Sequence, residues 1–556
     1  MEYLLGIDLG TTNCTVTAID ENGDTTVIKN RDGDVVTPSA VYFCEKENNF
    51  IIGKKAKELA SEDVNERLVT LVKRQMGSEK TKVRRNPVSG KYKPYEYWGR
   101  LFSPEEISSK ILKQLKEDAE AQLNTKVSQA VITCPAYFKQ AQKEATRIAG
   151  ELAGFDVLEV ITEPSAAALS YSTVSKKLQD NGKETVFVFA LGGGTFDVTI
   201  IELTKEGKKV YTAQKSTDGD PRLGGADWDS ICRGNVIKSF NDKYNVNVAL
   251  EKGPEKEKTV GRLTLEVERL KKELSDPDIN EASVTMEYKG HSIKETYTRE
   301  KYANVTDELT EKCRVKCKNL MRETTMTWDE IDTILMVGSM SHCLFIQDAL
   351  RNLSGKEVFF GLIDPKVCVS LGAALYAYNK YCQKHNKVAE VSSQNEVLNY
   401  AGKKKGKKSK DSTVTIEDST SVLPASICLK GMKNGKVSCK TMLKRNQPYP
   451  CSYEDDFPMS FDNMTEVKLP VLEGESEDPS ENTEIGLVVL ELDGNNKKGD
   501  LVHVRFEIDE SGIIQVFAKD HKTNKSVQGK IQRNNLLSFD EIEEAKQYSE
   551  NDFFLI

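Results

Sequence analysis

Two turns rich in glycine and threonine are the residues in this chain best suited to chemistry. The first, Gly10-Thr11-Thr12, follows an apolar run that ends at Asp8, and another apolar run covers 15–19. The second, Gly192-Gly193-Gly194-Thr195, lies between apolar runs in the same way. Such turns offer backbone N–H groups and hydroxyls to phosphate oxygens. Because the arrangement occurs twice, it predicts two related halves that hold one nucleotide between them.

Asp8 and Ala190 occupy the same place in these two halves, since Asp8-Leu9-Gly10 aligns with Ala190-Leu191-Gly192. A carboxylate at the end of a strand could hold Mg²⁺ through water, because Mg²⁺ keeps much of its hydration shell. The second half carries a methyl group at that place. Taken alone, the first turn is also compatible with an ordinary β-hairpin.

The elements that must position these turns belong to a chain of 556 residues, long enough for roughly three to four domains or subdomains. Its 78 Lys and Arg against 86 Asp and Glu give a net charge of −8, which argues against general nucleic-acid binding. No apolar run approaches the ~20 residues of a membrane helix, and the start of the chain is not a secretory leader, so we expect a cytoplasmic protein with no membrane contact.

The twelve cysteines form no C-x-x-C pair, and the chain has only five histidines. Cys313 and Cys317 are four residues apart, but no second pair completes a zinc set. We therefore expect reduced, structural cysteines.

Helical and strand patterns alternate over 1–385, which indicates an α/β domain. Ser103-Pro104-Glu105-Glu106 predicts a helix start with a capping box, and 139–153 predicts a helix that stops at Gly154. Short β patterns at 487–492, 502–508 and 513–518 predict an antiparallel domain, and 538–549 resembles a helix start.

The segment after residue 385 is polar and contains the basic run Lys403–Lys410. We interpret it as a solvated, self-repelling linker. A docking site for acidic protein, RNA or lipid, or a localisation signal, is the alternative.

Four motifs together resemble those of the Hsp70 (DnaK-like) chaperone family within the actin-like ATPase superfamily. They are Gly6–Thr12, Thr162–Ala168, Leu191–Val198 and Leu223–Asp229. Residues Asn446–Pro450, Glu473–Glu475 and Gly512–Asp520 resemble the family's peptide-binding domain. The resemblance implies an α/β fold with a two-lobed actin-like ATPase domain followed by an antiparallel β-sandwich. It divides the chain into the nucleotide-binding domain 1–385, the linker 386–418, the substrate-binding domain 419–535 and the start of a truncated helical lid, 536–556.

The same resemblance implies site residues for ATP or ADP, Mg²⁺ and, as a further candidate ion, K⁺. Lys73, Glu163, Thr195 and Asp8 would be catalytic, with Asp8, Glu163 and Asp197 near the metal. The phosphates would lie against Gly10, Thr11, Thr12, Gly192, Gly193, Gly194, Thr195, Gly224 and Gly225. The ribose and adenine would lie against Glu268, Lys271, Lys272 and Ser275 on a helix over 263–274, and against Gly338, Met340, His342 and Asp364. Pro135 and Arg147 would relay nucleotide state between domains.

Three positions depart from the family pattern. Ala190 replaces an Asp, which predicts slowed hydrolysis with nucleotide binding retained. Ser339 and His342 replace a glycine and a stacking arginine, which predicts weaker or altered adenine binding. The linker segment Val414–Asp418 contains polar Thr415 and acidic Glu417, which predicts weakened docking and interdomain coupling.

Two functions follow from this resemblance. The first is an Hsp70-like chaperone that couples ATP/Mg²⁺ binding to the binding of unfolded or extended polypeptide, as a monomer with a J-domain co-chaperone and a nucleotide exchange factor as partners. The alternative is a pseudo-ATPase regulator or co-chaperone with little turnover. A metabolite kinase of the same fold has no use for a C-terminal β domain.

Overall fold

The computed structural model describes residues 2–45, 49–62, 67–83, 91–175, 177–178, 181–251, 253–359, 363–392, 413–433, 435–509, 512–531, 541–543 and 545. The basic run at 403–410 lies outside the described residues, as does most of the helix expected at 538–549. Within the described part of the chain, none of the helices has the length and apolar character to span a bilayer. All twelve cysteines are free thiols, as expected.

The first central sheet carries the first predicted turn at one end. Its strand order is β11 (Asp156–Thr162), β10 (Gln129–Cys134), β1 (Tyr3–Asp8), β2 (Asn13–Asp20) and β3 (Thr25–Ile28). β1 pairs in parallel with β10 and antiparallel with β2. The short β4 (Thr37–Pro38) also pairs with β2.

The second central sheet repeats this arrangement around the second turn. It runs β18 (Val358–Phe359), β17 (Thr333–Val337), β12 (Lys183–Leu191), β13 (Phe196–Glu206) and β14 (Lys209–Asp220), and β20 (Thr413–Val422) and β19 (Glu390–Ser392) extend it. β12 pairs in parallel with β17 and antiparallel with β13. The chain therefore contains the two related halves that the repeated turn predicts.

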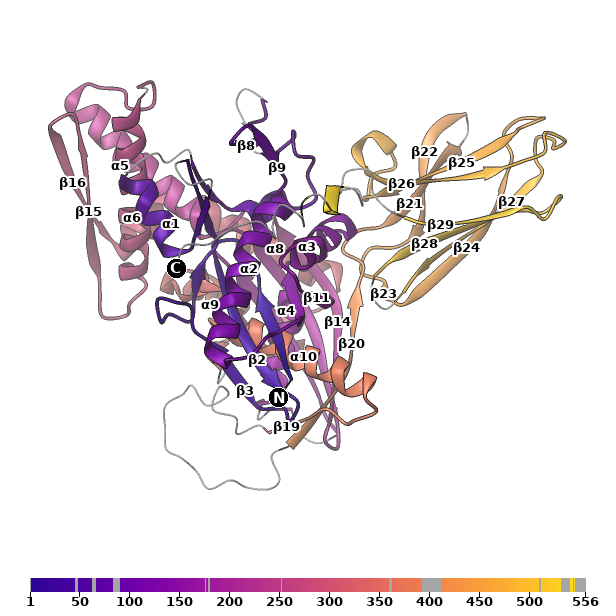
Figure 1. Ribbon diagram of the computed structural model, residues 1–556, viewed down its shortest axis with the longest axis horizontal. Coiled ribbons are helices and arrows are strands. Elements are labelled where there is room, and N and C mark those ends of the chain that lie inside the picture. The colour runs from indigo at the N-terminus through magenta and orange to yellow at the C-terminus, as the bar shows by residue number, and fades with distance from the viewer. Residues whose placement is uncertain are drawn as a thin grey trace.

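Helices cover these sheets and the hairpin at 281–298, and they carry several site residues (Figure 1). They are α2 (Pro104–Leu123), α3 (Gln140–Leu152), α4 (Glu163–Ser172), α5 (Gly225–Tyr244), α6 (Pro254–Leu274), α7 (Arg299–Val305), α8 (Asp307–Glu323), α9 (Leu344–Ser354) and α10 (Cys368–Lys384). The predicted capping box of α2 is confirmed, because Ser103 N donates to Glu106 Oε2 at 2.8 Å and Glu106 N donates to Ser103 Oγ at 3.1 Å. The predicted helix over 139–153 is confirmed as α3.

Smaller elements form the edges of the two halves. They are α1 (Lys54–Glu62), β5 (Ala40–Cys44), β6 (Asn49–Ile52), β7 (Leu68–Thr70), β8 (Tyr95–Tyr97), β9 (Arg100–Phe102), β15 (Glu281–Tyr288), β16 (His291–Thr298), and the 3₁₀ turns η2 (Val72–Gln75), η3 (Trp328–Glu330) and η4 (Ser339–His342).

Glu105, in the first turn of α2, makes stability depend on pH. Its carboxylate accepts a hydrogen bond from Gly77 N at 3.0 Å, yet burial raises its pKa from 4.5 to about 7. Because the pKa of Glu105 is higher in the folded than in the unfolded protein, its contribution to the free energy of unfolding is fully present below pH 4.5. That contribution is lost as the pH rises through 7. Glu105→Gln should therefore stabilise the protein at pH 8 by up to about 3 kcal/mol and have little effect at pH 4.5. Denaturant unfolding of both proteins at the two pH values measures this, and an equal effect at both would contradict it.

The C-terminal unit consists of two four-stranded antiparallel sheets. One has the order β22 (Lys436–Leu443), β21 (Ile427–Lys433), β25 (Glu466–Glu473), β26 (Thr483–Glu491), and the other β24 (Cys451–Pro458), β27 (Leu501–Ile508), β28 (Ile514–Asp520), β29 (Ser526–Lys530). Both contribute to one apolar cluster, with Leu443 and Val471 from the first sheet and Val504 and Phe506 from the second fully buried. The strands expected near 487–492, 502–508 and 513–518 correspond to β26, β27 and β28. β23 (Pro448–Tyr449) and the 3₁₀ turn η6 (Pro479–Glu481) complete the unit.

Residues 413–418 form strand rather than the irregular linker expected there. β20 pairs in parallel with β14 and antiparallel with β19, and it then leads into the C-terminal unit (Figure 1). Val414 and Ile416 pack into the apolar cluster of the second half, and Thr415 is also buried. Glu417 pairs with Lys209 at 2.8 Å. The polar residues predict weakened docking, but side chains alternate along a strand, so Val414 and Ile416 face the core while Glu417 pairs with a lysine.

Candidate functional site

A cavity of about 800 Å³ is lined by residues from both halves of the α/β region. The first half contributes Thr12, Lys57 and Arg74. Of the residues predicted from the sequence, its wall includes Thr12, Gly193, Gly225, Glu268, Lys271, Lys272, Ser275, Met340 and His342. Most of the residues expected to hold a nucleotide are thus collected around one space.

The two glycine-rich turns meet at this cavity without room for larger side chains. A Cβ on Gly193 would lie 1.9 Å from Thr12 Oγ1, and one on Gly194 would lie 2.3 Å from Thr11 Cγ2. Gly10 is equally confined, with Asn13 O at 2.0 Å from a Cβ placed there. The second turn is closed by a hydrogen bond from Gly192 N to Thr195 O at 3.0 Å. Steric closeness therefore accounts for glycine at three of these positions, whereas Gly192 has more space.

The beginning of α5 is joined to the second turn. Gly225 N donates to Gly192 O at 3.0 Å, and Ala226 N donates to Gly193 O at 2.8 Å. Gly224 precedes the helix, and a Cβ there would lie 2.4 Å from Gly194 N. The N-terminal end of a 20-residue helix therefore lies at the cavity, where its dipole favours an anion.

Arg74 connects the same region across the two halves, although no local pattern singles it out. Its Nε donates to Gly194 O at 2.7 Å and its Nη2 to Asp227 Oδ2 at 2.5 Å. The only hint was its position directly after Lys73.

Beyond the turns lies a buried cluster of charged residues. Lys73 Nζ donates to Glu163 Oε1 at 2.6 Å, and the lysine side chain is 2% exposed. Glu163 is the first residue of α4, where Thr162 caps the helix. Asp8, at the end of β1, accepts a hydrogen bond from Thr133 Oγ1 at 3.2 Å. Asp197, near the start of β13, accepts one from Tyr137 N at 3.4 Å.

The charges in this cluster influence each other. Burial, reinforced by the charge of Glu163, raises the pKa of Asp8 to about 7. The same two causes raise the pKa of Asp197 well above its ordinary value. Burial alone would lower the pKa of Lys73, but Glu163 and Asp8 outweigh it and the pKa is raised. The Lys73 ammonium therefore stays charged. A further positive charge nearby would favour the ionised forms of Asp8 and Asp197.

The carboxylates do not converge closely enough to bind one ion directly together. Among the described residues, the only group of three or more His, Cys, Asp or Glu ligand atoms within 4.8 Å of one another lies elsewhere in the chain. Asp8, Glu163 and Asp197 would thus act on a metal through water. Two buried oxygens here have no hydrogen-bond partner among the described residues, Thr11 Oγ1 and Asp197 Oδ2. A hydroxyl and a carboxylate oxygen left unpaired fit a hydrated cation and phosphate oxygens.

The predicted ribose and adenine residues on α6 lie on the opposite wall. Glu268 pairs with Lys57 of α1 at 3.2 Å and with Lys272 at 2.8 Å, which joins the two halves. Burial opposes the charge of Glu268, but these two lysines lower its pKa to about 2. Lys271 is engaged by Asp229 at 2.7 Å and by Gly225 O at 2.9 Å.

The remaining predicted residues surround that wall. Ser275 Oγ donates to Lys271 O at 2.8 Å. Gly338 has φ +87°, and a Cβ there would lie 2.5 Å from Leu191 O. Burial and then Lys366 lower the pKa of His342, so a neutral imidazole faces the cavity. Asp364 does not line the cavity; its carboxylate accepts a hydrogen bond from Lys366 N at 2.9 Å.

A protein-family model described as Hsp70 protein matches residues 4–553. The chain belongs to the Hsp70 family. That match spans both the α/β region and the C-terminal unit, and it supports a chaperone of the Hsp70 type.

The register of this Hsp70 chain supports the alignment of Asp8 with Ala190. In the first hairpin Asp8 pairs with Thr15, with residues 9–14 between them. In the second, Ala190 pairs with Asp197, with residues 191–196 between them. The two positions are thus equivalent in the two hairpins, and the buried methyl of Ala190 stands where the first half has a partly buried carboxylate.

The two residues predicted to relay nucleotide state in the Hsp70 chain lie on neighbouring elements. Pro135 directly follows β10, and Arg147 on α3 donates to Val157 O at 2.7 Å and pairs with Glu159 at 3.3 Å. α3 itself reaches the C-terminal unit, because Lys143 Nζ donates to Tyr449 OH at 3.2 Å.

A second contact between the regions was not foreseen. Arg445 Nη2 donates to Thr217 O at 2.8 Å, and Thr217 N donates to Asn446 Oδ1 at 3.4 Å. Arg445 also lies 3.7 Å from Asp218. Residues 446–450 resemble the family pattern, but no local pattern indicates which residues they contact.

Proposed function

We propose that this Hsp70 protein binds ATP with Mg²⁺ in the cavity and that bound nucleotide biases the binding of extended polypeptide by the C-terminal unit. The observation that carries the nucleotide part is the meeting of two glycine-rich turns and a helix N-terminus at one cavity. Backbone N–H groups and a helix dipole favour phosphates. The opposite wall, with Glu268, Met340 and His342, would accommodate the ribose and adenine.

Each group in the buried cluster has a task in this proposal. Thr11 would give its unpaired hydroxyl to a phosphate oxygen, and Asp8 and Asp197 would hold water molecules around the metal. Mg²⁺, when bound, would neutralise phosphate charge. Lys73, fixed by Glu163, would orient the attacking water and stabilise the negative charge of phosphoryl transfer.

Ala190 limits how well the cluster can perform that reaction. A carboxylate at position 190 would contribute to the same metal and water network as Asp197, its cross-strand partner, and the methyl group cannot. We therefore expect ATP to bind and hydrolysis to be slow. This observation also favours the second candidate function, a nucleotide-binding regulator or co-chaperone of the Hsp70 type with little turnover.

Single-turnover hydrolysis of labelled ATP by the full chain, after binding has been measured by calorimetry, tests the proposal. Bound ATP that persists for hours would support the regulator. Turnover on a scale of minutes would support the chaperone cycle. A chain that binds no nucleotide in the presence of Mg²⁺ would overturn both.

Exposed apolar side chains of the C-terminal unit support the polypeptide part of the proposal. Of the twelve large apolar side chains that are exposed among the described residues, six lie between 432 and 501: Met432, Val437, Tyr453, Phe461, Leu487 and Leu501. Extended peptides combine backbone hydrogen bonds with apolar contacts of this kind. A J-domain co-chaperone and a nucleotide exchange factor remain predicted partners.

β20 is the connection through which nucleotide state would reach that unit. Ile416 is 2% exposed within the core cluster of the second half. Ile416→Asp should release β20, because a buried unpaired carboxylate costs more than the strand pairing supplies. We expect the change in peptide affinity caused by ATP to fall at least threefold, with ATP affinity little altered. Fluorescence anisotropy of a labelled extended peptide, with and without ATP, measures this.

Glu417→Gln is the matched control for that experiment. It removes the half-exposed ion pair with Lys209 and leaves the apolar residues of β20 in place. Such surface pairs contribute about 0–1 kcal/mol. Coupling should persist in this variant. Equal coupling in Ile416→Asp and the unaltered protein would show that β20 does not transmit the signal.

A further inference from the structure

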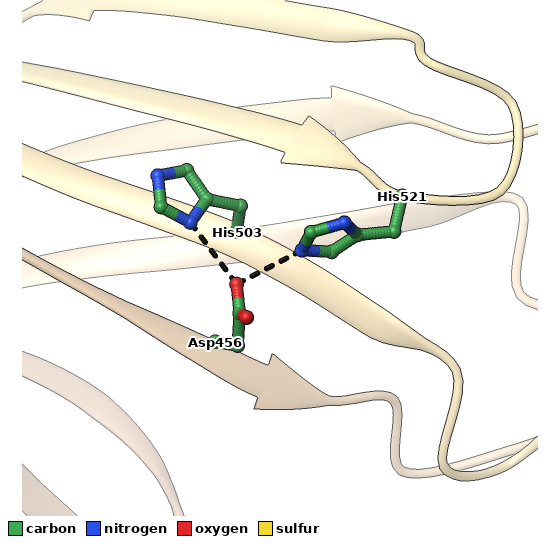
Figure 2. A group of neighbouring side chains, drawn as sticks. All are labelled: Asp456, His503 and His521. Atoms are coloured by element: carbon green, nitrogen blue, oxygen red, sulfur yellow. Dashed lines mark hydrogen bonds and ion pairs between the residues drawn. The ribbon is translucent and has the colours of Figure 1, made fainter.

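Two of the five histidines in this chain meet one aspartate on the outside of the C-terminal unit. Asp456 lies on β24 and is the direct cross-strand partner of His503 on β27. His521 directly follows β28, and its backbone N–H donates to Leu501 O at 3.2 Å. Figure 2 shows both imidazole rings pointing at the same carboxylate. Three neighbouring segments therefore present their polar groups to one place.

The distances between these groups suit a single small ion. His503 Nδ1 and His521 Nε2 each lie 3.0 Å from Asp456 Oδ1, and all three ligand atoms lie within 4.8 Å of one another. Zinc bonds of about 2.0–2.1 Å in tetrahedral geometry place neighbouring ligand atoms roughly 3.3 Å apart. The two nitrogen-to-oxygen distances would have to open by only a few tenths of an ångström.

The surroundings supply a further carboxylate that would support a metal. Glu454 Oε2 lies 3.6 Å from His503 Nε2, the ring nitrogen that does not face Asp456. A carboxylate on the outer nitrogen of a ligand histidine fixes the ring and strengthens it as a donor. Lys519 opposes a cation here, since it is the cross-strand partner of His503 on β28.

We propose that Asp456, His503 and His521 form a binding site for a divalent transition metal, with Zn²⁺ as the expected ion. Two imidazoles and one carboxylate are a donor set that zinc accepts, and the partly exposed position leaves a fourth ligand place for water. The ion would join β24, the edge strand of its sheet, to β27 and to the turn after β28. The site is separate from the nucleotide cavity and does not depend on its function.

Isothermal titration of ZnCl₂ into the full chain, without nucleotide and with millimolar Mg²⁺ present, tests the site. We expect one zinc ion per chain whose affinity falls at least ~10-fold in His521→Ala. His521 is the best residue to change, because its side chain is 52% exposed and lies in a turn. Asp456→Asn, also exposed, is the second variant should His521→Ala fail to fold by circular dichroism.

His291→Ala is the matched control. His291 is exposed at the start of β16 and stacks on Tyr244, far along the chain from the cluster. This variant should keep full zinc affinity, and Glu454→Gln should weaken it by about 10-fold. Every variant retains all twelve cysteines, so zinc bound by thiols would appear equally in each. An absence of zinc binding, or equal affinity in His521→Ala and the unaltered protein, would overturn the proposal.

Discussion

Ala190→Asp should increase the single-turnover rate of ATP hydrolysis by about 10²-fold, the effect of one well-placed electrostatic group at a reaction centre. The register places position 190 opposite Asp197 and in the same hairpin position as Asp8. A carboxylate there would add negative charge beside the proposed metal and its water. ATP affinity should change much less than the rate, because the turns and the opposite wall are unaltered. Quenched-flow measurement with labelled ATP gives the rate.

Ala190→Asn separates charge from size. Its amide has nearly the shape of the carboxylate but no charge, so it should give little of the increase. Ala190→Asp should also lower the melting temperature without Mg²⁺ and nucleotide, because it adds a fourth carboxylate near Asp8, Glu163 and Asp197. Adding Mg²⁺ and nucleotide should restore much of the lost melting temperature. If hydrolysis by Ala190→Asp stays at the rate of the unaltered protein, the slow step has another cause.

Lys73→Met should affect both chemistry and stability. The ammonium is 2% exposed and lies 2.6 Å from Glu163 Oε1, so its removal leaves a mostly buried carboxylate unpaired. Breaking a buried pair in this way costs about 3–5 kcal/mol in the free energy of unfolding. Hydrolysis should fall about 10²–10³-fold, as expected when charge stabilisation at the reaction is lost. Denaturant unfolding and single-turnover assays measure the two effects.

The double variant Lys73→Met with Glu163→Gln distinguishes the two roles. Without the unpaired carboxylate, most of the stability should return, because removing both charges is far less costly than removing one. Hydrolysis should remain low, since neither the cation nor the carboxylate is restored. A double variant that recovers hydrolysis would show that Lys73 acts only as a structural partner of Glu163.

Features that depend on residues close together in the chain follow from the sequence alone. The capping box at Ser103–Glu106, the end of α3 near Gly154 and the two turns at 10–12 and 192–195 each follow from local spacing. The matching of Asp8 with Ala190 also needed only the sequence, because Asp8-Leu9-Gly10 and Ala190-Leu191-Gly192 each lead into a turn rich in glycine and threonine. The resemblance to the Hsp70 family rests on four such local motifs, and it predicted nine of the residues that line the cavity.

Which distant residues meet depends on the folded chain and does not follow from local patterns. In the pairs Arg74 with Asp227, Lys57 with Glu268 and Arg445 with Thr217, a long basic side chain reaches a residue far away in the sequence, so no local pattern indicates the partner. The same holds for Asp456, His503 and His521, which lack metal-site spacing and come together because β24 and β27 pair in one particular register. β20 illustrates the reason most clearly. The polar residues of this segment predict a linker. The segment forms a strand because it pairs with β14 at the edge of the second central sheet. That edge exists only once the chain has folded.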